Sequence, residues 1–335
     1  MKGHPMTPLD PQAPRKSLIA LIWDEVYGIT TAKDKRYSAK RLSVLLVLLV
    51  ALFITAGYYS ARTIQWWDNP LTAHLRGVPL QVSWVIIAGG MVIFLAMLGV
   101  QVHGRIGGAL IDQRKLMSLS RFQLVSWTIL VTSAFLTIAL VRVFTADLDD
   151  PLAIDIPSQV WQLLGISVAS TVGSGMVLSS KKTKPVPNAD VLATDTAAAL
   201  NAQVSDATPE QKTTADEIEE YRQGSVYCNP TAADASIVDM FQGDEVGNTA
   251  HIDMSKVQMF FFTIAALIAY GTSVYNMLGT SPANLASLPE VTPGLVTILG
   301  ISHAAYISNK ALDHSNTSVS ATAQAAANDA MEQDA

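Results

Sequence analysis

The sequence predicts an all-α integral membrane protein with about six transmembrane helices, and three observations support this prediction. Half of the 335 residues are hydrophobic and only 15% are charged, whereas about a quarter of the residues are charged in ordinary soluble domains. The mean hydropathy is +0.30. The chain also contains apolar segments that approach the roughly 20 residues, at about 1.5 Å rise each, that a bilayer core requires. The lipid bilayer is therefore the expected environment.

The predicted spans alternate with polar connections. They are residues 42–59, 82–102, 122–141, 158–178, 257–278 and 293–308. Apart from His303, no side chain within them is charged or titrates near neutral pH, so their hydropathy is consistent along each segment. The fourth and sixth segments are rich in Gly, Ser, Thr and Ala, and buried or re-entrant helices are the alternative for both.

The distribution of Lys and Arg predicts the orientation of the spans. Basic residues gather in 15–41, 105–121 and 181–184, whereas the intervening connections carry few of them. Because translocation of cationic segments is disfavoured, we expect both termini and the long 181–253 segment to be cytoplasmic. The basic clusters adjoin apolar runs and form no separate stripe, which argues against binding of nucleic acid.

An internal repeat covers the last four predicted spans. LSRFQ at 119–123 corresponds to MSKVQ at 254–258, and LGIS at 164–167 corresponds to LGIS at 299–302. Both matches share an offset of 135 residues. The pattern predicts a tandem duplication of one two-helix hairpin, in which units 111–180 and 254–311 have parallel orientation.

Each predicted unit has two local features. Ser120 with Gln123, and Ser255 with Gln258, have the spacing of capping boxes at a helix start. The second helix of each unit has a stripe of small residues, which allows close packing of helices. These helix-packing candidates are Gly165, Ala169, Gly173, Gly300, Ala304 and Ser308.

The remaining chain divides into four parts. We predict a basic arm over 1–41 with an interfacial helix near 17–27, two spans in 42–110, an acidic insertion over 181–253 that is partly helical and partly disordered, and a disordered tail over 312–335.

Inside the insertion, helices are expected over 208–222 and 232–242. The second has an apolar cluster that needs a partner, which is the membrane surface, the bundle or another protein. Its members are Ile237, Val238, Met240 and Phe241. The acidic, glycine-flanked loop at 242–248 lacks the alternating oxygen ligands of an EF-hand, so a plain turn is favoured over a cation site.

Few residues suggest chemistry, and no enzymatic function is predicted. The sequence has no Gly-rich phosphate loop, HExxH or GxSxG motif, and one cysteine, Cys228, excludes a multi-cysteine metal site. We therefore predict no catalytic residues, metal or cofactor. The candidate polar site within the membrane consists of His303, Ser302, Ser167, Thr128 and Thr263, with Tyr270 and Tyr306 as polar neighbours.

The strings LGISVAS at 164–170, LGISHAAYISNK at 299–310 and SKVQMFFFT at 255–263 resemble those of an uncharacterised family of bacterial multi-pass membrane proteins. The resemblance covers residues 118–178 and 253–311. It implies a bacterial inner membrane and adds no catalytic residues.

Two functions fit these observations. The first is a scaffold or anchor that recruits a cytoplasmic protein through the N-terminal arm and the 181–253 insertion. The second is an ion or small-solute channel or transporter in which polar residues of the repeated helices line a path. A homo-oligomer is compatible with this second function.

Overall fold

The computed structural model describes residues 39–67, 79–145, 150–202, 212–279 and 285–315, and its regular elements are all helices. The contacts divide the chain between Ser43 and Val44. The larger of the two compact units begins at Val44. The prediction of an all-α membrane protein is confirmed.

Five helices are long and apolar enough to cross a membrane. They are α2 (Ala39–Trp67), α3 (Leu80–His103), α4 (Leu119–Phe144), α5 (Ser158–Lys181) and α8 (Met254–Leu278). The sixth predicted span is a helix, α9 (Pro293–Ala311), but it does not belong to this set. Its middle carries His303 and its end carries Asn309 and Lys310, which lower its apolarity. Residues 158–178 are confirmed as part of a helix with the length and composition of a span.

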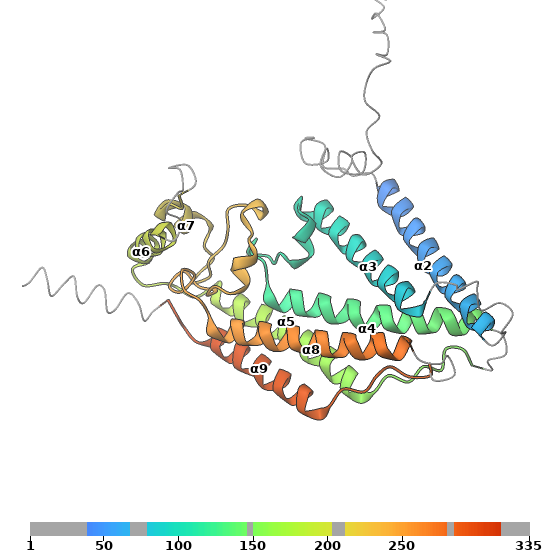
Figure 1. Ribbon diagram of the computed structural model, residues 1–335. Helices are drawn as coiled ribbons and strands as arrows, with labels where there is room; N and C mark the ends of the chain where they lie inside the picture. The colour runs from blue at the N-terminus through green and yellow to red at the C-terminus, as the bar shows by residue number, and fades with distance from the viewer. Residues whose placement is uncertain (1–38, 68–78, 146–149, 203–211, 280–284, 316–335) are drawn as a thin grey trace, which may run out of the picture. The chain divides into compact units, whose positions relative to one another are not determined.

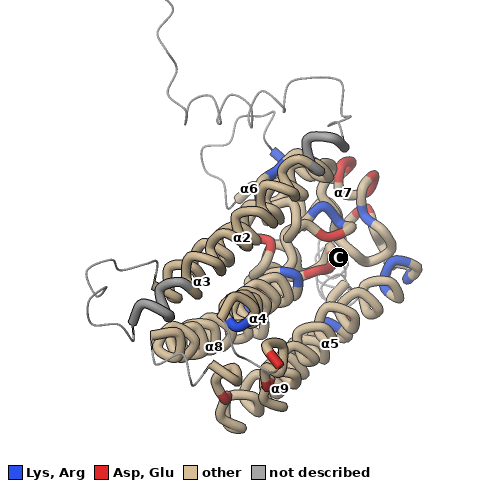
Figure 2. Tube along the Cα trace, turned by 90° about the vertical axis from the view of Figure 1, so that its right-hand side faces the viewer, with Lys and Arg blue, Asp and Glu red and all other residues tan. Residues whose placement is uncertain are grey.

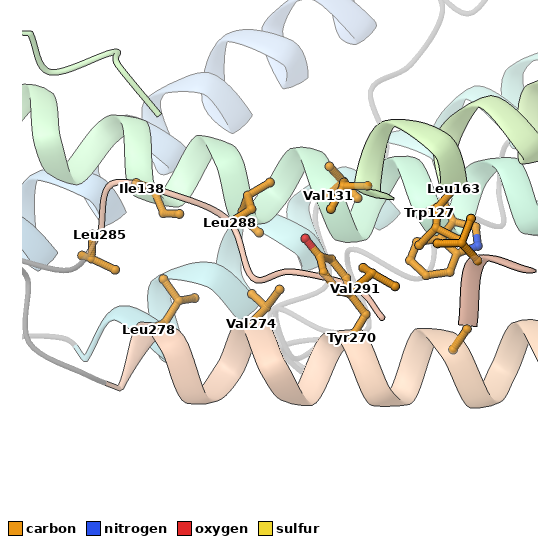
Figure 3. Packing of buried hydrophobic residues seen from close by; sticks show 14 of the residues in the cluster. Trp127, Val131, Ile138, Leu163, Tyr270, Val274, Leu278, Leu285, Leu288 and Val291 are labelled. Atoms are coloured by element: carbon orange, nitrogen blue, oxygen red, sulfur yellow. The ribbon is translucent and has the colours of Figure 1, made fainter. Parts of the chain in front are cut away.

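Helices α4, α5, α8 and α9 pack side by side as a bundle (Figure 1). Helices α4 and α8 begin at one end of the bundle, where α5 and α9 finish, and the 181–253 insertion joins this end; we call it the insertion end. The opposite end is the far end. Toward the far end the interior is apolar, and Figure 3 shows Trp127, Val131, Leu163 and Tyr270 in this core.

Helix α3 packs against α4. The indole Nε1 of Trp84, on α3, donates a 2.9 Å hydrogen bond to the hydroxyl of Ser133, on α4. A short 3₁₀ helix, η2 (Ile106–Leu110), returns from the end of α3 and lies directly against it. Gly99 and Gly108 allow this approach, because a Cβ atom on Gly99 would lie 2.7 Å from the backbone N of Gly108. In the connection between α3 and α4, the backbone of η2 therefore packs directly against the backbone of α3.

At the far end, the two connections inside the hairpins lie together. The backbone N of Asp155 donates to the carbonyl of Ala286 at 2.8 Å, and the N of Leu288 donates to the carbonyl of Asp155 at 2.9 Å. Arg142, in the last turn of α4, donates to the carbonyl oxygens of Asp150 and Pro151, both at 2.9 Å. One guanidinium therefore satisfies backbone groups that would otherwise lack partners.

The predicted capping boxes are wrong, because each helix begins earlier than the boxes require. The N-cap of α4 is Ser118, without a side-chain bond, and that of α8 is Asp253, which accepts from the backbone N of Ser255 and Lys256. The Ser120 hydroxyl and the Gln123 amide instead bond across the bundle. Gln258 is exposed.

The predicted small-residue stripe is only partly a packing surface. Gly165, Ala169, Ala304 and Ser308 are exposed in this chain. Gly173 lies at the contact of α5 with α9, where an added Cβ would meet Ile307 at 3.2 Å, and Gly300 faces Ile166. Larger or polar residues on the neighbouring faces of α5 and α9, such as Leu163, Ser167 and Tyr306, are buried instead.

Five buried positions of α5 and α9 correspond at an offset one residue longer than the sequence match. In α5 they are Val160, Leu163, Ser167, Ser170 and Ser174; in α9 they are Val296, Leu299, His303, Tyr306 and Lys310. Ser302, which matches Ser167 at the offset of the sequence, is buried as well, so the two LGIS strings share one buried serine while their other residues differ in burial. The duplication remains a prediction from the sequence.

The insertion is folded over its described residues, 181–202 and 212–253. Helix α6 (Ala189–Ala202) packs on α7 (Ala215–Tyr221) around Leu192, Ala193 and Ile218. The predicted helix over 232–242 is two short 3₁₀ turns, η4 (Ala232–Asp234) and η5 (Ile237–Met240). Each turn begins at a capping box, and Ala235 separates them.

Three predictions fall on other parts of the chain. The basic arm with its interfacial helix, the start of the helix expected over 208–222, and the tail beyond Ser315 lie outside the described residues.

We expect Gly99→Ala to destabilise the protein, because the new methyl group would overlap the backbone of η2. Overpacking of this kind costs about 1–3 kcal/mol. Thermal unfolding in detergent measures the loss as a lower Tm. Gly89→Ala in the same helix is the matched control, since a Cβ there meets nothing within 4 Å. Equal Tm values for the two variants would contradict the close approach.

Candidate functional site

The most distinctive site is a group of buried charges at the insertion end of the bundle. The carboxylate of Asp244 lies 2.7 Å from Arg114 Nη1, 3.0 Å from Lys256 Nζ and 3.0 Å from Lys310 Nζ. All four side chains are at most 7% exposed. We call them the Asp244 cluster, and Asp112 adds a second carboxylate 2.8 Å from Arg114.

The next residue, Glu245, makes a second buried pair. Its carboxylate lies 2.5 Å from Lys181 Nζ, accepts from the Ser315 hydroxyl at 2.8 Å and accepts from the backbone N of His314 at 3.1 Å. Lys181 also donates to the carbonyl of Leu312. Asp244 and Glu245 together therefore hold one cation from the entrance to α4 and one each from α5, α8 and α9.

The electrostatics of Asp244 follow from its surroundings. Burial opposes ionisation of this carboxyl, but Lys256, Lys310 and Arg114 outweigh the burial, and the pKa of Asp244 lies well below its usual range. For Arg114, burial is again outweighed by Asp244 and Asp112, so its pKa is raised. Asp244 and Arg114 are therefore both ionised at neutral pH. Figure 2 shows that the charged residues lie mostly at the helix ends and in the connections, whereas the helices themselves carry few charged residues.

The loop that carries the two carboxylates depends on its glycines. A Cβ on Gly243 would lie 2.2 Å from Asn248 Oδ1, and a Cβ on Gly247 would lie 2.5 Å from the carbonyl of His314. The same Asn248 oxygen accepts from the backbone N of Glu245 at 3.0 Å. The loop at 242–248 contains the bends and turns that the sequence predicted, and its two carboxylates are buried against protein cations. No group of metal-ligating side chains occurs among the described residues.

A polar path continues from the cluster into the bundle. Lys310 Nζ donates to the Tyr306 hydroxyl at 2.9 Å. That hydroxyl also lies 3.1 Å from the Ser120 hydroxyl and 3.2 Å from the Ser174 hydroxyl. Tyr306 thereby joins α9 to α4 and α5 in the interior.

One helical turn deeper lies a second set of polar side chains. The amide of Gln123 donates to the Thr263 hydroxyl at 2.5 Å. Several buried polar atoms nearby or deeper in the bundle have no hydrogen-bond partner among the described residues. They are Gln123 Oε1, Ser170 Oγ, Ser302 Oγ, His303 Nδ1 and, further along α8, Tyr270 Oη.

Four of the five residues of the predicted polar site are buried in the structure. His303, Ser302, Ser167 and Thr263 are buried. Ser167 bonds to the carbonyl of Leu163, and Thr263 bonds to that of Met259.

Thr128 does not join them, because it lies on the exposed face of α4. Sequence reasoning missed Ser120 and Gln123, which it assigned to caps, and it missed Ser170 and Ser174. The recurrence of serine at 167, 170 and 174 was the available signal.

The apolar cluster predicted to bind a partner divides in two. Met240 is buried and Phe241 packs edge-on against Phe260, with ring centroids 5.1 Å apart. These two residues dock within the chain. Ile237 and Val238 are 65% and 52% exposed. The turns that carry them are fastened to the α3–α4 connection, since Arg105 donates to the carbonyl of Ala233 at 2.6 Å and Asp239 accepts from the N of Met117 at 3.1 Å.

An open hollow of about 550 Å³ lies beside the start of α8 and the end of α9. Its lining includes His251, His314 and Asn309 together with Ile252 and Met254, which are 70% and 69% exposed. Asn309 donates to Asp253 at 3.0 Å and so ties the two helices at this point. The hollow combines hydrogen-bonding groups with accessible apolar surface.

We expect Asp244→Asn to loosen the insertion, because three buried cations would lose their shared anion. Breaking a buried pair in this way costs about 3–5 kcal/mol. Cys228 is the sole cysteine of the chain, is buried beside Leu178 of α5, and has a pKa raised by burial. Its rate of maleimide labelling under native conditions should therefore rise in the variant.

Asp313→Asn is the matched control for that experiment. The Lys184–Asp313 pair is much more exposed, at 43% and 25%, and pairs of this kind contribute about 0–1 kcal/mol. Labelling of Cys228 that stays slow in Asp244→Asn, or that accelerates equally in both variants, would contradict a special role of the Asp244 cluster.

The stability that Asp244 provides should depend on pH. The pKa of Asp244 in the folded protein lies below the ordinary aspartate value of about 4. Its contribution to the free energy of unfolding is therefore fully present above the ordinary value and is lost as the pH falls through the folded-state pKa. The difference in Tm between the wild type and Asp244→Asn should therefore narrow as the pH is lowered from 5 to 3. A difference that stays constant would mean that Asp244 is not the group responsible.

Comparison with known proteins adds no family to this description. No protein-family model, curated protein or solved structure matches the chain.

Proposed function

We propose that the protein is a non-enzymatic membrane anchor that holds a folded cytoplasmic module ready for a soluble protein partner. The observation that carries the proposal is the attachment of the insertion to the bundle. Asp244 and Glu245 belong to the insertion, and their cations belong to the bundle helices and the entrance to α4. A linker between two spans would not require such contacts.

The burial of these charges supports a fixed module over a mobile loop. Moving an ion out of water costs several kcal/mol, and the cost is recovered only when the geometry of the pair is well defined. Backbone bonds reinforce the attachment, since the N of Asn229 donates to the carbonyl of Arg114 at 3.0 Å. The module therefore presents its surface in one orientation relative to the bundle.

The partner surface that we propose contains the exposed apolar residues of η5 and the adjoining hollow. Residues 241–243 pair with 251–253, so the segment after η5 leads directly to Ile252 and Met254. Apolar side chains surrounded by polar groups are typical of protein interaction sites. Basic residues gather on the cytoplasmic side of a membrane, and the basic clusters of this chain lie on the same side as this surface, so in our proposal the surface faces the cytoplasm. The membrane that we propose is that of a bacterial cell.

Crosslinking followed by affinity purification from native membranes tests the proposal. We expect the wild type to retain a soluble protein and the double variant Ile237→Asp and Val238→Asp to lose it. Val191→Asp on α6 is the control, because Val191 is also exposed but lies outside the proposed surface. Slow maleimide labelling of Cys228 in each variant shows that the module is intact. Purification of the wild type without any soluble partner would contradict the anchor.

The polar interior favours a second candidate function, a channel or transporter. Polar side chains extend from the Asp244 cluster through Tyr306 to His303. The apolar core of Trp127, Leu163 and Leu299 lies beyond them, so ions would need a rearrangement of the bundle to pass.

Flux through proteoliposomes distinguishes the two functions. For the transport function, we expect a measurable flux of ions or small solutes that His303→Ala and Ser302→Ala reduce by at least about tenfold, which corresponds to 1.4 kcal/mol. Thr128→Ala is the control, because Thr128 lies on the outer face of α4. An absence of flux, or an equal effect of all three variants, would exclude transport by this polar path.

A further inference from the structure

We infer that the bundle interior contains a water-binding site formed by Gln123, Ser170, Ser302 and His303. These side chains come from α4, α5 and α9 and are between 0% and 4% exposed. Each has a polar atom without a hydrogen-bond partner among the residues that the structure describes. This site is separate from the partner surface proposed above.

Helix geometry places the four side chains at one level. Ser120, Ser174 and Tyr306 are in mutual hydrogen-bond contact through the Tyr306 hydroxyl. From that point Gln123 is three residues along α4, Ser170 is four residues back along α5, and Ser302 and His303 are four and three residues back along α9. Because α4 runs opposite to α5 and α9, all four lie about one turn further from the insertion end.

The bond between Gln123 and Thr263 fixes part of this level. It uses the amide nitrogen of Gln123 and leaves the amide oxygen, Oε1, facing no donor. Thr171 next to Ser170 is also engaged, since its hydroxyl donates to the carbonyl of Ser120 at 3.2 Å. Gln123 and Ser170 therefore lie beside side chains whose own hydrogen bonds are already made.

The energetic argument concerns the cost of unsatisfied groups. A buried donor or acceptor without a partner costs about 1–3 kcal/mol, and four of them at one level would be unusual in a folded protein. Water that bridges two to four polar groups removes this cost. One amide oxygen, two hydroxyls and one imidazole nitrogen supply both donors and acceptors for it.

The charges nearby favour water over a metal cation. No carboxylate belongs to this level, and the nearest charged group along α9 is the ammonium of Lys310, which bonds Tyr306. A cation would meet repulsion from Lys310 and would lack an anionic ligand. Neutral water has neither difficulty.

Apolar side chains close the site on the far side. Trp127 follows Gln123 by one turn, Leu299 precedes His303 by one turn, and both are 1% exposed. The water is therefore confined between the Tyr306 hydroxyl and the apolar core, as a blind extension of the polar path.

An experimental structure of the full chain in lipid nanodiscs tests the inference directly. We expect density for at least one water within hydrogen-bond distance of two or more of the four atoms. Well-defined side chains without such density, or side chains rotated so that they bond one another, would overturn the inference.

Serine substitutions give an independent test through stability. If water bridges the hydroxyls, Ser170→Ala and Ser302→Ala each remove a bonded group, and the unfolding equilibrium constant should rise by about fivefold or more. If the hydroxyls are unsatisfied, the alanine variants should be as stable as the wild type or more stable. Ser273→Ala is the control, because this serine is exposed on α8.

Replacing chloride with gluconate in the same measurement examines an anion as the occupant. Stability of the wild type should be unchanged, because neutral water does not depend on the salt. A loss of stability that is restored by chloride, and that is absent in Ser170→Ala, would overturn the inference in favour of an anion site.

Discussion

The arrangement of the insertion and the bundle depends on two adjacent carboxylates. Asp244 and Glu245 hold Arg114, Lys256, Lys310 and Lys181, and so fix the entrance to α4 and one end each of α5, α8 and α9 from a single loop. Since the burial of each unpaired ion would cost several kcal/mol, the four cations and two anions must fold together. The loop therefore determines where the helix ends lie, and the helix ends determine the position of the insertion.

The interior of the bundle changes character along its length because of this constraint. At the insertion end the charges require polar neighbours, and Tyr306, Ser120 and Ser174 provide them. At the far end apolar side chains fill the interior. Between the two ends, the side chains of Gln123, Ser170, Ser302 and His303 are at most 4% exposed, so their unpartnered polar atoms are shielded from bulk water. The membrane anchor that we propose is compatible with this arrangement.

Several sequence predictions failed where two functions of one residue type compete. Ser120 and Gln123 have the spacing of a capping box, but the N-cap is Ser118, two residues earlier, and both side chains bond across the bundle. Helix α6 lies in a part of the insertion where no helix was predicted, although its sequence is rich in alanine, which has the highest helix propensity. The repeated LGIS strings were expected to be equivalent, yet five buried positions of α5 and α9 correspond at an offset one residue longer, and within the two strings only the serines, Ser167 and Ser302, are both buried.

The sequence by itself determined the membrane class, the helical content and the approximate bounds of the helices, because hydropathy and length are local properties of the chain. It also indicated that His303 and Ser302 are unusual. Only the tertiary structure decided that the acidic loop binds the helix ends, that Thr128 faces outward, and that Met240 is buried while Ile237 is exposed. The physical reason is that charge pairing and burial depend on residues far apart in the chain, whose meeting no local pattern specifies.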